Sequence, residues 1–176
     1  YFGAQRVRGK RGRGASGKGI SMLRNAIKYL SENKDKKALL WNMEDTCDDI
    51  HRRINILKNN GVSVPNHING RLSVLDNYEN FNLEEMRVHF KDFDYVVIDP
   101  LSYLIDGEEN NAAAVKPVIQ RFQQICSEEK KIIILVHHEA KGPNGTGSGQ
   151  ARGSSSLSDN VRLSYSISHT EDDGCI

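Results

Sequence analysis

The chain has 176 residues and is nearly balanced in charge, with 24 Lys and Arg against 23 Asp and Glu, so it suits one domain with a sizeable core and requires no acidic partner. Its three cysteines form no CxxC pair, which argues against a disulfide framework or a zinc site and favours a reducing cytoplasm. No apolar run approaches the ~20 residues of a membrane span, and the start at Tyr1 leads us to expect a fragment that forms a single domain over residues 1–176.

The first informative stretch is GRGASGKG at residues 12–19, which comes close to the phosphate-binding P-loop pattern G-x-x-x-x-G-K-[ST]. Gly12, Gly17 and Lys18 fit the pattern. Gly19 does not, because it stands where the pattern has a hydroxyl that binds magnesium. In a P-loop, backbone N–H groups and a helix N-terminus hold the phosphates, and the lysine reaches the β- and γ-phosphates.

The residues before this loop are unusually basic, since residues 6–13 hold five Arg and Lys and no acid. Such a run is either solvated charge or a funnel for phosphates. The strand before a P-loop should be apolar, and only Phe2, Ala4 and Val7 are available for it. Taken alone, the loop is therefore as compatible with a chance match as with a nucleotide site.

Apolar periodicity then alternates between helix and strand along the chain. Helical spacing predicts helices over residues 20–30, 50–57 after a Thr46–Asp49 capping box, 82–90 and 115–125. Apolar runs predict strands over residues 38–43, 72–75, 95–98, 132–136 and 161–167. Residues 142–156 are rich in Gly and Ser and are predicted to form a flexible loop. This alternation predicts an α/β fold with a mostly parallel sheet.

Polar residues follow three of these predicted strands, where ligands bind in parallel α/β sheets. Glu44 follows the first strand and is either a base for an attacking water or an exposed acid before a helix. Asp99 closes an apolar run and is either a magnesium ligand or a turn former before Pro100. His137 and His138 follow a third strand, where alternation sends one ring to each face, and a structural role is the alternative for either.

Five stretches together resemble a known family. In order they are GASGKG, NMEDTCDDIHRRI, YVVIDPLSYL, ILVHHEAKG and ARGSSSLSDNVR, within residues 12–162. They resemble the RecA-like ATPase core of RepA-type hexameric replicative helicases of plasmids, and the related ATPases of phages and mobile elements. The last stretch is the most specific of the five.

The resemblance implies a RecA-like P-loop NTPase with a mostly parallel central sheet flanked by helices. It also implies an ATPase that serves as a DNA helicase motor in plasmid or phage replication, with ATP and Mg²⁺ as cofactors. The partners that it implies are single-stranded DNA and further copies of the chain in a hexameric ring. Residues 142–156 occupy the place of a loop that faces DNA, with flexibility alone as the other interpretation.

The resemblance also implies roles for individual residues. It makes Glu44 the catalytic base, Asp99 the magnesium acid and His138 the sensor of the γ-phosphate. It makes Arg162 an arginine finger that enters the neighbouring subunit's site, so that ATP turnover depends on assembly. The nucleotide-binding residues that it implies are Gly12, Gly14, Ala15, Ser16, Gly17, Lys18, Gly19, Ile20 and Arg53.

Gly19 is the main departure from the family pattern. Ser21 is a poor substitute ligand, because two helical positions turn it roughly 200° away. We therefore expect a water on magnesium, held by Asp99, to replace the hydroxyl, and a Gly19→Ser change to lower the magnesium requirement. An ATP-binding regulatory or structural subunit with little hydrolysis is the alternative function. A P-loop kinase is the third, although no lid segment is evident.

Overall fold

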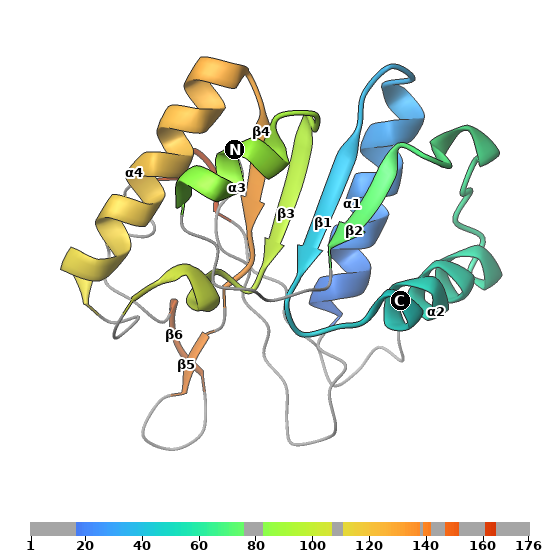
Figure 1. Cartoon of the computed structure of the whole chain (residues 1–176). Helices are drawn as coiled ribbons and strands as arrows, with labels where there is room; N and C mark the ends of the chain where they lie inside the picture. The colour runs from blue at the N-terminus through green and yellow to red at the C-terminus, as the bar shows by residue number, and fades with distance from the viewer. Residues whose placement is uncertain are drawn as a thin grey trace.

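The computed structural model describes residues 17–75, 83–106, 111–137, 139–141, 147–151 and 161–164. Within these residues, four strands form one all-parallel sheet in the order β2-β1-β3-β4 (Figure 1). The strands are β1 (Ala38–Asn42), β2 (Leu72–Leu75), β3 (Tyr95–Asp99) and β4 (Ile132–Leu135). The strands predicted from apolar runs are therefore confirmed at these four places.

Helices cover both faces of this sheet (Figure 1). One face carries α1 (Lys18–Glu32) and α2 (Cys47–Asn59), and the other carries α3 (Leu83–Phe90) and α4 (Ala112–Glu129). Two short 3-10 helices, η1 (Asn66–Ile68) and η2 (Leu101–Leu104), lie in the connections. Parallel strands with helices on both faces are the predicted α/β architecture.

Alternation along each strand divides the core between the two faces. On β3, Val96 and Ile98 pack with α3 and α4, whereas Tyr95 and Val97 pack with α1 and α2. The same alternation continues to the end of the strand, so Asp99 falls on the α1 side. The strands are buried on both faces, which explains why they are continuous apolar runs in the sequence.

The predicted capping box before α2 is also confirmed. Thr46 accepts from the backbone N–H of Asp49, and the Asp49 side chain accepts from the backbone N–H of Thr46, so the predicted capping box begins α2. At the carboxyl end of α1, Arg71 donates to the carbonyl oxygens of Leu30 and Asn33, at 3.1 and 2.8 Å. These hydrogen bonds connect the residue before β2 to the end of α1.

The structure adds detail to three of the predicted elements. The helix marked by apolar residues from Val115 to Ile125 is confirmed as α4, which begins at Ala112 because the Asn111 side chain caps it by accepting from the N–H of Ala113. The loop prediction for 142–156 was wrong over 147–151, where β6 (Gly147–Ala151) pairs antiparallel with β5 (Glu139–Lys141). Of the strand predicted over residues 161–167, the structure describes residues 161–164, with a bridge at Ser164.

The residues available for a strand before the P-loop lie outside the described residues, as does Asn82, which we expect to cap the helix that follows it. Residues 142–146 and 152–156 of the predicted loop are also outside them. Among the helices that the structure describes, none has the length and apolar character to cross a bilayer.

Candidate nucleotide site

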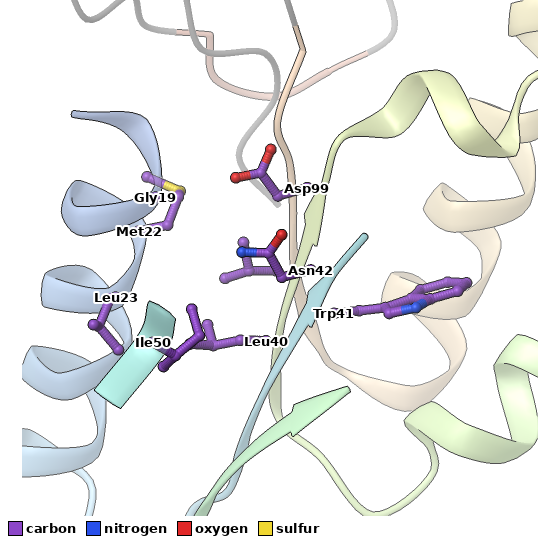
Figure 2. A pocket seen from close by; sticks show the side chains of 9 residues that line it. Gly19, Met22, Leu23, Leu40, Trp41, Asn42, Ile50 and Asp99 are labelled. Carbon is purple, nitrogen blue, oxygen red and sulfur yellow. The ribbon is translucent and has the colours of Figure 1, made fainter. Parts of the chain in front are cut away.

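The candidate site lies where the carboxyl ends of β1 and β3 face the first turn of α1. Asn42 and Asp99 are paired positions at the ends of these two strands, and the N–H of Met43 donates to the carbonyl of Asp99 at 2.9 Å. A pocket opens between these strand ends and α1, lined by Gly19 and Asp99 among others. Figure 2 shows Asn42 and Asp99 on the α1 side of the sheet, with Trp41 directed to the opposite side.

Gly17 and Lys18 form the entry to α1. Gly17 has a φ of 64°, a left-handed conformation that favours glycine, and its carbonyl accepts from the N–H of Ser21 at 2.9 Å. Lys18 is the first residue of the helix and is only 4% exposed. Burial lowers its pKa, and the nearby charges of Asp99 and Glu44 act in the opposite direction. The lysine therefore lies within electrostatic reach of both predicted acids.

Asp99 has the properties expected of a magnesium ligand. It is 7% exposed, and burial raises the pKa of its carboxyl to about 6, against the lowering effect of Lys18. Its Oδ1 atom is buried and accepts no hydrogen bond within the described residues. A buried carboxylate oxygen without a donor is suited to a hard divalent cation, which prefers oxygen ligands and keeps several waters. Asp99 thus fits Mg²⁺ held by one carboxylate and water.

Glu44 follows β1 by two residues and is exposed. Its backbone N–H donates to Oδ1 of Asn42 at 3.0 Å, which fixes the turn that follows β1. The charge of Glu44 acts on both Lys18 and Asp99. An exposed carboxylate beside a buried lysine and a buried acid is placed to meet water that enters from solvent.

Asp45 is a site residue that the sequence analysis missed. Its carboxylate forms a bidentate ion pair with Arg53 of α2, at 2.5 Å from Nη1 to Oδ2 and 2.8 Å from Nη2 to Oδ1. Asn42 supports this pair, since its Nδ2 donates to Oδ2 of Asp45 at 2.7 Å. The acid three residues after a strand-end Asn, in an Asx-type turn, is the sequence signal that could have indicated it.

The space beside Gly19 is occupied by the Arg53 guanidinium. A Cβ atom built on Gly19 would clash with Nη1 of Arg53 and would lie 2.8 Å from its Cζ. The expected Gly19→Ser change therefore requires the guanidinium to move. Arg53 packs directly against the backbone of Gly19 and fills the space that a side chain at this position would need.

The structure does not bring every predicted residue to this site. Ile20 is partly buried and packs against the core between α1 and the sheet. The charge of Arg162 acts on Cys126, which lies in the last turn of α4. Burial raises the pKa of that thiol to about 11, and Arg162 acts in the opposite direction. Gly12, Gly14, Ala15, Ser16 and His138 are outside the described residues.

The AAA domain family matches residues 12–144, which is more than half of the chain and includes the whole candidate site. The chain belongs to the AAA domain family. This membership makes it an ATPase-type P-loop domain, which the sequence also predicted.

The chain is also similar to the crystal structure of a KaiC-like protein from the hyperthermophilic archaeon Pyrococcus horikoshii. The TM-score is 0.53 at 13% sequence identity, over 98% of this chain and 73% of that protein. At this identity the likeness bears on the fold alone, and it agrees with the RecA-like arrangement of the sheet. No curated protein matches the chain at a significant level.

Proposed function

We propose that this AAA domain binds ATP with Mg²⁺ and hydrolyses it as the motor domain of a helicase-like protein in plasmid or phage replication in the cytoplasm. One observation carries the ATPase part of the proposal. The buried Lys18, the buried Asp99 and the exposed Glu44 come from three separate segments and lie within electrostatic reach of one another. ATP hydrolysis by P-loop domains uses a helix N-terminus, a lysine, a carboxylate that holds the metal and a general base.

Each of these residues has a distinct task in the proposed reaction. Lys18 meets the β- and γ-phosphate oxygens and offsets the charge that develops on them. Asp99 holds Mg²⁺, which when bound neutralises the phosphate charge. Glu44 accepts a proton from the attacking water, a task that suits its exposed position. His138 senses the γ-phosphate.

The helicase part of the proposal rests on assembly. Arg162 is exposed, and its charge acts on Cys126 in the last turn of α4. We assign it to the site of a neighbouring copy in a ring, where it acts as the arginine finger. Single-stranded DNA is the proposed substrate of that ring.

A domain that binds ATP with little hydrolysis is the second candidate. Gly19 favours it, because the chain lacks the hydroxyl that P-loop enzymes use to hold magnesium. The two candidates differ in turnover and not in binding.

The test is the ATP hydrolysis rate of the chain with and without single-stranded DNA, at several protein concentrations. We expect hydrolysis that rises with DNA and with protein concentration, and none in a Lys18→Ala variant. ATP binding without hydrolysis under every condition would favour the second candidate. Unchanged ATP affinity in Lys18→Ala, measured by calorimetry, would exclude both.

A further inference from the structure

The turn after β1, the second residue of α1 and one arginine of α2 form a connected unit. Asn42 is buried at the end of β1, and its Oδ1 accepts from the N–H groups of Glu44 and Asp45, each at 3.0 Å. Its Nδ2 holds the Asp45 carboxylate at 2.7 Å, and that carboxylate holds both Nη atoms of Arg53. The guanidinium is thereby fixed in position and orientation.

Gly19 completes this unit by having no side chain. A Cβ at this position would lie 2.8 Å from Cζ of Arg53 and 3.3 Å from its Nη2, besides the clash with Nη1. Both Nη atoms bond the Asp45 carboxylate, so a shift of the guanidinium away from Gly19 strains this pair unless Asp45 moves with it. Any side chain at position 19 therefore competes with the Asp45–Arg53 pair.

The unit lies beside the place where a nucleotide's phosphates would bind. Gly19 belongs to the first turn of α1, whose N-terminus is the phosphate-binding end in the proposed function. The charges of Asp45 and Arg53 both act on Asp99, so the pair lies within electrostatic reach of the metal acid as well. Guanidinium presents five N–H donors, and Asp45 takes two of them in the described structure. The remaining donors can serve phosphate oxygens.

We propose that Asp45 and Gly19 are positioning residues for Arg53: Asp45 orients its guanidinium toward the phosphates of bound ATP, and Gly19 leaves it the space to lie against α1. This inference rests on the proposed function, since it adds two residues to the same nucleotide site. A fixed guanidinium there supplies positive charge to the phosphates in a chain whose P-loop lacks one metal ligand. Part of the ATP affinity is then independent of Mg²⁺.

The test measures the affinity of a fluorescent ATP analogue for the whole chain, in EDTA and in Mg²⁺. In EDTA we expect Arg53→Ala to weaken binding about tenfold, the loss typical of one charged hydrogen-bonding group. Asp45→Asn and Gly19→Ala should each weaken it in the same direction. The decisive measurement repeats Asp45→Asn and Gly19→Ala in the Arg53→Ala background, where neither should weaken binding further.

Arg52→Ala is the matched control, because Arg52 precedes Arg53 on α2 but pairs with Asp49 and is 71% exposed. It should bind as the parent does. Thermal unfolding of each variant tests that it folds, and if Asp45→Asn does not fold, the Gly19→Ala cycle alone decides.

Losses of the same size with and without Arg53 would overturn the inference, as would parental binding by Asp45→Asn and Gly19→Ala. The Lys18→Ala variant separates this failure from that of the proposed function. If Lys18→Ala loses binding while Asp45→Asn retains it, only the positioning role is wrong.

Discussion

Asn42 of β1 and Asp99 of β3 are directly paired in the parallel register, and both fall on the face that α1 covers. The segments that follow these two residues therefore leave the sheet side by side, at its carboxyl edge. Glu44 comes two residues after Asn42, and this placement brings its charge to bear on Asp99 and Lys18. The pairing explains how acids 55 positions apart in the sequence (residues 44 and 99) act on one lysine.

Glu44→Gln should retain ATP binding and lose turnover, because it removes the proposed base and leaves Lys18 and Asp99 intact. We expect hydrolysis to fall by about 10²- to 10⁴-fold, the usual contribution of a general base. Single-turnover hydrolysis and calorimetric binding of the same preparation check this. Hydrolysis at the parent rate would show that Glu44 is not the base.

Asp99→Asn should change the metal dependence of binding rather than binding itself. The asparagine retains the size of the side chain but offers Mg²⁺ a neutral oxygen in place of a carboxylate. A magnesium titration of ATP-analogue binding should shift to higher concentration, while affinity in EDTA should stay close to that of the parent. Titration curves that coincide for the two proteins would remove Asp99 from the metal site.

Gly19→Ser should weaken ATP binding in the parent protein, contrary to the expectation from the sequence alone. The serine Cβ meets the Arg53 guanidinium and displaces it from the helix. In an Arg53→Ala background the space is open, and there the hydroxyl should lower the magnesium concentration that binding requires. A benefit from serine in the parent background would contradict the structure at this point.

Arg162→Ala should bind ATP normally and hydrolyse it slowly, because the proposed finger acts on the site of a neighbouring copy. Mixing it with Glu44→Gln should restore part of the hydrolysis, because one type of mixed interface contains both intact residues. The rate is measured across mixing ratios, with mixed assembly checked by light scattering. Absence of rescue in mixed assemblies would argue against a finger that acts in trans.

Asp94 should make the stability of the fold depend on pH. Its carboxylate accepts from Nζ of Lys36 and from the N–H of Lys37, each at 3.0 Å. Burial acts to raise the pKa of Asp94, but these hydrogen bonds and charges outweigh it, and the net pKa is lowered. A lowered folded-state pKa stabilises the protein above the unfolded-state value of 3.8, and this contribution is lost as the pH falls below it.

We therefore expect Asp94→Asn to lower the free energy of unfolding at neutral pH by about 1 kcal/mol, a modest value because solvent screens the partly exposed pair. The difference between variant and parent should shrink as the pH falls below about 4. Urea denaturation at a series of pH values measures this. Asp92→Asn, at an exposed position two residues earlier, is the control and should show little change.

The sheet and the acids at its edge could be predicted from the sequence because burial on both faces leaves a direct mark there. Val96, Val97 and Ile98 are all apolar for that reason, and the acid after them stands out. The Asp45–Arg53 pair leaves no such mark. It depends on the turn that Asn42 holds and on the direction of α2, which are tertiary features.

Two other differences have the same kind of origin. The strand at Gly147–Ala151 is made by backbone pairing with β5, and its Gly and Ser residues have no apolar pattern to indicate it. The contact of Arg53 with Gly19 was equally invisible, because a glycine in the sequence does not tell which neighbour occupies the space beside it.

Trp41 is the single tryptophan of the chain and is only 2% exposed. It lies on the opposite side of β1 from the site, edge-on to Phe90 of α3 with ring centroids 6.0 Å apart. Its emission therefore comes from one position in the core, directly before Asn42 in the chain. Intrinsic fluorescence should report loss of contact between α3 and the sheet. A shift in Trp41 emission on adding ATP would indicate that a movement of the turn after β1 is transmitted to β1 itself.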